Sequence, residues 1–279
     1  MKKFAYLMLL SAALWSCTST RYSYNPAAFY NPVFNEKGQS NVIARYSTGP
    51  SDESSGLGSR NDGMDVSAAY AISKRFSIAA TYYFRNEKDS YLNSWFLTPD
   101  GSHAEDSSIV NYNRKMFQIG AGYTIPFKNQ KSSFSVFAFT GVAANRMNDR
   151  GLNDNTPYSN YHNFNSYQFS VQPAVNFGLS SNITSSIISR VTYAHNYNIK
   201  TDYDGVFLYD AGLANINDLF YLALGYNMRV SFNTIPWLKL EGQFMISGSG
   251  QTTNTKHYAR GSSSSVGVSI DLKELMKKN

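Results

Sequence analysis

Apolar and polar side chains alternate with a period of two along most of the chain after residue 40. In residues 167–180, one face carries aromatic and aliphatic side chains, while the other carries Gln, Ser, Asn, Ala and Gly. Residues 220–232, 117–127 and 76–85 repeat this alternation. A period of two is typical of a β-strand, because successive side chains point to opposite faces of a sheet. The alternation therefore predicts an all-β protein.

Ten segments of this kind can be counted, although eight or twelve strands remain possible. The connections between them alternate in length, which is the layout of an antiparallel up-and-down transmembrane β-barrel with short periplasmic turns and long external loops. An even number of strands then places the N-terminus and the C-terminus on the periplasmic side. The six weaker strands are 41–48, 64–73, 133–145, 185–198, 237–247 and 263–272, and the long connections are 49–63, 87–108, 146–163, 199–217 and 248–262.

The polar face of these strands indicates which side meets lipid. A strand face in contact with water is usually rich in Lys and Glu, but charged residues are only 16% of this chain. The polar face is mainly Gly, Ala, Ser, Thr, Asn and Gln, and small side chains of this kind suit a confined lumen. We therefore expect the apolar face to contact lipid. A soluble periplasmic lipid-carrying barrel, with its apolar face inside, is the alternative.

The N-terminus has the features of a secretion signal. Met-Lys-Lys is followed by an apolar run from Phe4 to Trp15, which predicts a signal peptide over residues 1–16. The sole cysteine, Cys17, follows Leu14-Trp15-Ser16, and this arrangement resembles the bacterial lipoprotein signal. The resemblance implies a diacylglycerol and an acyl chain on Cys17. A single cysteine also excludes a disulfide framework.

The sequence after the signal peptide divides into three segments. Residues 17–40 contain two prolines and many polar residues, so we expect an N-terminal periplasmic tether. The barrel itself is expected over residues 41–272. Residues 273–279 would form a short basic C-terminal tail.

On this pattern the chain resembles the small outer-membrane β-barrel proteins of the OmpA, OmpX and OmpW kind, joined to a lipoprotein signal. The resemblance implies the outer membrane of a Gram-negative cell envelope, with outer-membrane lipid as a partner. One departure is the C-terminus, because such barrels commonly finish on an aromatic residue. Here the last strand ends at Ile270-Asp271-Leu272, and Lys273 to Asn279 follow.

Several charged residues fall on the polar face of the strands and should point into the lumen. Burying such a side chain in lipid costs roughly 2–4 kcal/mol for Arg or Lys at the membrane midplane. We expect a lumen packed by ion pairs and hydrogen bonds, and a narrow anion-leaning channel is the alternative. The predicted lumen network is Arg45, Arg85, Arg114, Arg190, Arg229, Lys239, Glu241 and Asp271.

The sequence carries no catalytic, cofactor-binding or metal motif, so we do not expect an enzyme. A surface hydrolase using His195 with Asp202 or Asp204 is the remaining catalytic alternative. The segment Asp202-Tyr203-Asp204-Gly205 resembles the start of a calcium loop but lacks the closing Glu. Acidic external loops could still bind divalent cations loosely. Basic residues do not gather on one face, which excludes nucleic acid as a partner.

The sequence thus predicts a non-enzymatic outer-membrane β-barrel lipoprotein with a structural, adhesive or envelope-complex role and other envelope proteins as possible partners. The apolar cluster Val206 to Tyr209, within an expected external loop, is expected to fold over the barrel mouth as a lid, and its exposure to a partner is the alternative.

Overall fold

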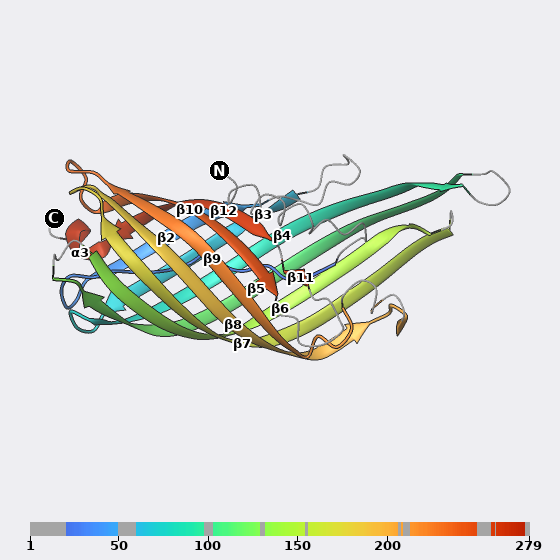
Figure 1. The fold of residues 1–279 in the computed structure, drawn as a ribbon, viewed down its shortest axis with the longest axis horizontal. Helices are drawn as coiled ribbons and strands as arrows, with labels where there is room; N and C mark the ends of the chain where they lie inside the picture. The colour runs from blue at the N-terminus through green and yellow to red at the C-terminus, as the bar shows by residue number, and fades with distance from the viewer. Residues whose placement is uncertain are drawn as a thin grey trace, which may run out of the picture.

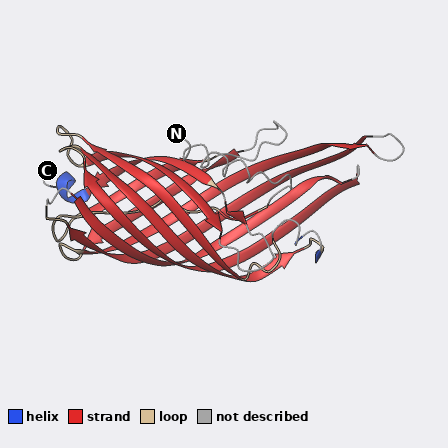
Figure 2. Cartoon of the chain, viewed as in Figure 1, coloured by secondary structure: helices blue, strands red, loops and turns tan. Residues whose placement is uncertain are grey.

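The computed structural model describes residues 21–49, 60–97, 103–128, 132–153, 156–205, 208, 213–249, 258–259 and 261–276. Strands dominate this part of the chain (Figure 2). Ten of them close into one barrel in which each strand pairs antiparallel with its two neighbours. The predicted class and the predicted number of ten strands are confirmed. No helix among the described residues is long and apolar enough to cross a membrane.

The wall follows chain order, and it closes because the last wall strand, β12, pairs with the first, β2, as well as with β10. A small parallel sheet joins β1 (Tyr22–Tyr24) to β11 (Tyr258–Ala259), and α3 (Leu272–Met276) follows the last strand. The wall strands are β2 (Ser40–Thr48), β3 (Arg60–Ala71), β4 (Phe76–Leu97), β5 (His103–Pro126), β6 (Ser132–Asn153), β7 (Thr156–Gly178), β8 (Ile183–Thr201), β9 (Asp218–Ser231), β10 (Leu238–Ser249) and β12 (Ser262–Asp271).

The apolar face of the wall points outward. On β7, Tyr167 and Phe169 are 55% and 51% exposed, whereas Ser166 and Gln172 are buried in the interior. Large exposed apolar side chains occur on all ten wall strands. A soluble carrier would place this face inside, so the observed orientation favours a barrel surrounded by lipid.

Strands β4, β5, β6 and β7 are 22 to 24 residues long and project beyond the rest of the wall at one end (Figure 1). The prediction of long loops over 87–108 and 146–163 is therefore wrong. Pairing continues to Leu97 opposite His103 and to Asn153 opposite Thr156. Backbone hydrogen bonds need no apolar face, so a strand can extend past the membrane after its hydrophobic alternation has faded.

The opposite end of the barrel carries the short turns and the C-terminal helix α3 (Figure 1). Lys273 of α3 lies 2.8 Å from Glu36, which precedes the first wall strand. Hereafter we call this the short-turn end, and the end at which β4 to β7 project is the extended end.

Residues 21–34, which we call the inserted segment, lie inside the barrel. Ala27, Phe29 and Tyr30 are 0% exposed. The segment begins at the extended end, where Arg21 binds Asp149, and reaches the short-turn end, where Asn31 binds Asn176. The sequence predicted a periplasmic tether over residues 17–40. The structure instead gives residues 21–34 a place in the lumen, because aromatic and small side chains there fill the space between the walls.

The inserted segment also determines at which end of the barrel the described part of the chain begins. Ten wall strands and one pass through the lumen make eleven crossings of the barrel, which is an odd number. Arg21 therefore lies at the extended end, while Asp271 lies at the short-turn end beside Asn41. The predicted periplasmic position of both termini stays a prediction, because residues 1–20 and 277–279 lie outside the described chain.

Candidate functional site: the lumen and its inserted segment

The wall holds the inserted segment largely through backbone atoms. Arg114 donates hydrogen bonds to the carbonyl oxygens of Tyr22 (2.5 Å) and Ser23 (3.1 Å). Tyr83 donates its hydroxyl to the carbonyl of Asn25 at 3.0 Å. Beyond its short pairing with β11, the segment has no neighbouring strand among the described residues, so its carbonyl groups need donors from side chains.

The central part of the segment is held in the same way. Arg190 donates to the carbonyls of Ala27 (3.0 Å) and Ala28 (3.3 Å). Two backbone amides find acceptors on the wall. The Ala28 amide donates to Asp65 at 3.2 Å, and the Phe29 amide donates to Gln243 at 3.0 Å.

Aromatic side chains of the segment fill the interior. Phe29 packs in a buried cluster with Ile188 on β8 and Met245 on β10. This contact explains an irregularity in the alternation, because Ile188 is an apolar residue on the polar face of its strand. Tyr30 joins a second buried cluster with Phe137 and Phe139. The segment thus has apolar partners on several strands.

The structure places all eight residues of the predicted lumen network on the interior face. Glu241 accepts hydrogen bonds from two of them, Arg45 at 2.7 Å and Arg229 at 2.6 Å. Lys239 lies 3.4 Å from Asp271 near the short-turn end. Ion pairing of this kind offsets the large cost of burying each charge.

The other three arginines of the network have different partners. Arg85 pairs with Asp65 at 2.6 Å, and Arg114 pairs with Glu87 at 3.0 Å. For Arg190, the hydrogen-bond acceptors are Gln172, at 2.6 Å and 3.1 Å, and the two carbonyls of the inserted segment. Arg190 thus differs from Arg85 and Arg114, because its described hydrogen-bond acceptors are neutral amide and carbonyl oxygens.

In one buried pair, neither residue was predicted to lie in the lumen. Arg21 donates from Nε (3.0 Å) and Nη2 (2.7 Å) to Asp149, and both side chains are almost fully buried. Asp149 also accepts hydrogen bonds from Ser108 at 2.6 Å, Tyr158 at 3.0 Å and Tyr203 at 2.8 Å. Residue 149 falls within the external loop predicted over 146–163. The carboxylate instead joins the inserted segment, the wall and the β8–β9 connection.

The β8–β9 connection covers the extended end of the lumen. Tyr203 and Leu213 are buried in a cluster with Val110 and Met147, and Leu208 packs against it. Burial raises the pKa of the Tyr203 hydroxyl. Of the predicted lid Val206 to Tyr209, only Leu208 lies within the described residues, and its packing agrees with a lid.

The short-turn end opens into a cavity of about 1060 Å³ below the inserted segment. Asn31 and Phe34 of the segment form part of its lining. None of the lining residues is acidic, while five are basic: Lys74, Arg75, Lys128, Arg229 and Lys239. The surroundings of this cavity therefore favour anions, although Glu241 and Asp271 pair with two of the cations.

His195 lies on the outward side of β8 rather than in a catalytic cleft. Its Nδ1 atom lies 2.9 Å from Asp218, and both side chains are about half exposed. Tyr193 also donates its hydroxyl to Asp218 at 2.5 Å. The pairing with Asp202 or Asp204 considered from the sequence is wrong, since Asp202 instead accepts a hydrogen bond from the Tyr161 amide at 2.5 Å.

Within the described ranges, no group of three or more His, Cys, Asp or Glu side chains is placed to hold a metal ion. The carboxylate of Asp202, first in the calcium-like segment, is bound to the backbone of β7. Tyr203, the next residue of that segment, points to Asp149.

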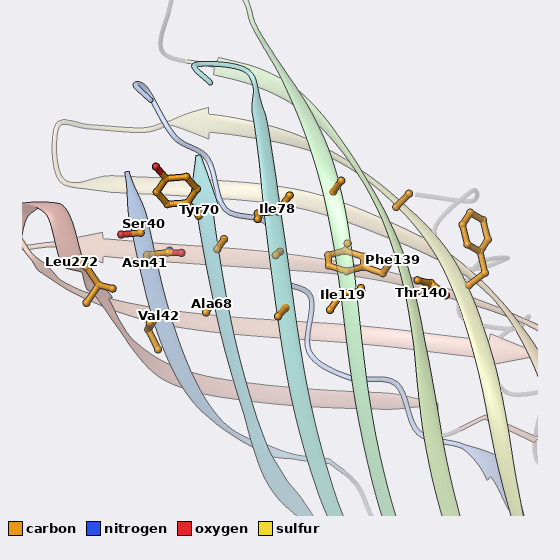
Figure 3. A pocket seen from close by; sticks show the side chains of 17 residues that line it. Ser40, Asn41, Val42, Ala68, Tyr70, Ile78, Ile119, Phe139, Thr140 and Leu272 are labelled. Atoms are coloured by element: carbon orange, nitrogen blue, oxygen red, sulfur yellow. The ribbon is translucent and has the colours of Figure 1, made fainter. Parts of the chain in front are cut away.

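A depression of about 780 Å³ lies on the wall near the short-turn end (Figure 3). Small outward residues, including Ala68 and Ala121, form its floor between the larger side chains of Tyr70, Ile78 and Ile119. It belongs to the membrane-facing belt, and in this position it would be covered by lipid chains.

Comparisons with known proteins give similarities at the level of shape. No protein-family model matches the chain. No curated protein matches it either. Neisserial surface protein A (NspA) is 11% identical, with 83% of this chain and 95% of that chain covered, at a TM-score of 0.29. Ail, the attachment invasion locus protein of Yersinia pestis, is 11% identical over 59% of this chain and 92% of that chain, at a TM-score of 0.32.

An outer membrane channel from Pseudomonas putida F1 is 9% identical, with 87% of this chain and 100% of that chain covered, at a TM-score of 0.37. These TM-scores are low, so support for the kind of barrel comes from the chain's own residues. Three features are together typical of an outer-membrane β-barrel protein: a closed antiparallel wall, an apolar exterior on every wall strand and an ion-paired polar interior.

Proposed function

We propose that this protein is a non-enzymatic outer-membrane β-barrel lipoprotein whose lumen is closed by its own inserted segment. Its role is then structural, adhesive or that of a subunit in an envelope complex. The observation that carries the proposal is the complete burial of Ala27, Phe29 and Tyr30 in the middle of the lumen. Solvent does not reach these side chains, so the centre of the barrel offers no open path.

The contacts of the segment favour a permanent closure. Arg21, Asn25 and Asn31 each form buried hydrogen bonds with wall side chains, and these contacts are spread along the whole lumen. A net contribution of about 0.5–1.5 kcal/mol for each such bond makes spontaneous withdrawal of the segment unfavourable. The barrel would thus present a sealed body in the membrane and a folded surface at its extended end.

The lipid anchor on Cys17 is part of the proposal. Its support is the sequence Leu14-Trp15-Ser16 before the sole cysteine. A Cys17→Ala variant should lose incorporation of radiolabelled fatty acid, while the barrel still inserts. Undiminished labelling of that variant would remove the anchor from the proposal.

The cavity at the short-turn end supports a second candidate function, a narrow anion-leaning passage. Its lining holds five basic and no acidic residues. Such a passage would require the inserted segment to leave the lumen, because the buried residues of the segment lie between the cavity and the extended end.

Planar-bilayer recording distinguishes the two functions. The purified full-length chain should give no stepwise conductance. Membrane insertion is measured in parallel for the unmodified chain and for two variants at Leu224, which lies on the outward face of β9. The variants are Leu224→Arg and its matched control Leu224→Met. Only the arginine variant should reduce the membrane-inserted yield, because it places a charge against lipid. Stepwise, chloride-selective currents from the unmodified chain would contradict the sealed barrel and support the passage.

A further inference from the structure

We propose that the chain enters the barrel from its extended end, so that the residues preceding Arg21, including Cys17, lie on the outer face of the membrane. This inference uses the orientation of the proposed function, in which the short-turn end faces the periplasm. It reverses the usual expectation for a lipid-anchored N-terminus, which would lie on the periplasmic side.

Contacts of successive residues establish the direction of the segment. Arg21 hydrogen-bonds Asp149 on the projecting part of β6. Further along the chain, the Ala28 amide donates to Asp65 in the middle of β3. Asn31 then donates to Asn176 near the last residue of β7, at the short-turn end. The segment therefore runs in one direction through the barrel.

The first residues of the segment are fixed at the extended end. Tyr22 pairs with Tyr258, and Tyr24 pairs with Ala259, in the connection between β10 and β12. Tyr24 also stacks on Tyr221, with ring centroids 4.0 Å apart. These contacts hold the entry point among residues that cover the extended end.

The preceding chain cannot return through the barrel. The lumen is occupied by the inserted segment and by buried wall side chains, and the ten strands pair without a lateral opening. Cys17 is four residues before Arg21, a distance of at most about 14 Å in an extended chain. The pass from Arg21 to Asn31 takes ten residues, so four residues are too few to reach the short-turn end.

In this topology, the residues before Arg21 lie outside the lumen at the extended end. If Cys17 carries lipid, its acyl chains would lie at the surface around the extended end.

Three variants of the full-length chain, each with one cysteine added to Cys17, test this topology. Thr20→Cys reports on the chain just before the segment. Asp204→Cys reports on an exposed position at the extended end, and Lys37→Cys reports on an exposed position at the short-turn end. Cells are treated with a membrane-impermeant maleimide before and after permeabilisation, and each signal is scaled to that of the denatured protein. The unmodified chain gives the background from Cys17.

We expect positions 20 and 204 to be labelled at least fivefold more than position 37 on intact cells. Labelling of Thr20→Cys only after permeabilisation, together with labelling of Asp204→Cys on intact cells, would overturn the inference but leave the proposed barrel intact. Labelling of Lys37→Cys but not Asp204→Cys on intact cells would overturn the proposed orientation, and with it the outer-face location.

Discussion

The ring of Phe29 lies against the backbone of Gly225. A Cβ atom added at Gly225 would lie 2.5 Å from Cε2 of Phe29 and 2.5 Å from the carbonyl oxygen of Phe244. The absence of a side chain at this position on β9 therefore allows the inserted segment to pass close to the wall.

Replacing Gly225 with Ala should destabilise the closed barrel by about 1–3 kcal/mol, the usual effect of overpacking a core. The unfolding free energy can be measured by urea titration in detergent, with the gel shift of the folded barrel as the readout. In the Phe29→Ala background, the same substitution should cost less. Some loss should remain there, because the Phe244 carbonyl is still close. Equal losses in the two backgrounds would show that Phe29 does not pack on Gly225.

Replacing Asp149 with Asn should loosen the extended end. The change removes the charge that pairs with buried Arg21, and breaking such a pair typically costs 3–5 kcal/mol. Limited proteolysis should then cut within residues 21–34 sooner than in the unmodified protein. The double variant Arg21→Gln with Asp149→Asn is the control, since it removes both charges. It should be more stable than Asp149→Asn, and a double variant that is less stable would contradict the pairing.

His162 should make the stability depend on pH. It is buried beside Phe164 on β7, beyond the apolar belt towards the extended end, and burial lowers its pKa from 6.5 to about 4. The unfolded chain takes up a proton near pH 6.5, while the folded protein resists protonation until about pH 4. Stability should therefore be full above pH 6.5 and fall by up to about 3 kcal/mol as the pH decreases to about 4.

The control for this pH dependence is His162→Phe, which keeps an aromatic ring and removes the titration. Urea midpoints recorded between pH 4 and pH 7 should slope less for the variant than for the unmodified protein. Parallel slopes would assign the acid sensitivity to other groups.

The wall strands were predictable because one face of each strand contacts an apolar environment and the other contacts a polar one. Lipid selects apolar side chains at Leu222 and Leu224, and the lumen selects polar ones at Asn227, so a period of two appears in the sequence. The same parity placed Arg45 and Glu241 inside. It could not identify their partners, because pairing across the lumen depends on the register and closure of all ten strands.

The inserted segment was not predictable from its own alternation, since it has no strand partner along most of its length. Two signals for it exist in the sequence. Residues 22–35 carry no charge and are rich in aromatic side chains. Phe137, Phe139 and Ile188 are apolar residues on the polar face of their strands, and such residues require an apolar partner in the lumen.

Buried acids at the extended end were also missed. Glu87, Asp89 and Asp149 fall within the external loops predicted over 87–108 and 146–163, yet all three are buried. The local sequence around an acidic residue does not distinguish a carboxylate that is hydrated from one that pairs with a buried arginine. Only the continuation of β4 and β6 beyond the apolar belt distinguishes the two cases.

Cross-linking between the segment and the wall tests the central claim, that residues 21–34 occupy the lumen. Ala27 and Ala143 belong to one buried cluster with Tyr83 and Met116, whereas Ala71 lies at the short-turn end of β3. Chains carrying Ala27→Cys with Ala143→Cys, or with Ala71→Cys as the control, are treated in isolated outer membranes with a short thiol cross-linker and analysed by peptide mass spectrometry. We expect a linked 27–143 peptide and little or no 27–71 product. Free modification of both thiols by a water-soluble maleimide, without a 27–143 link, would contradict it.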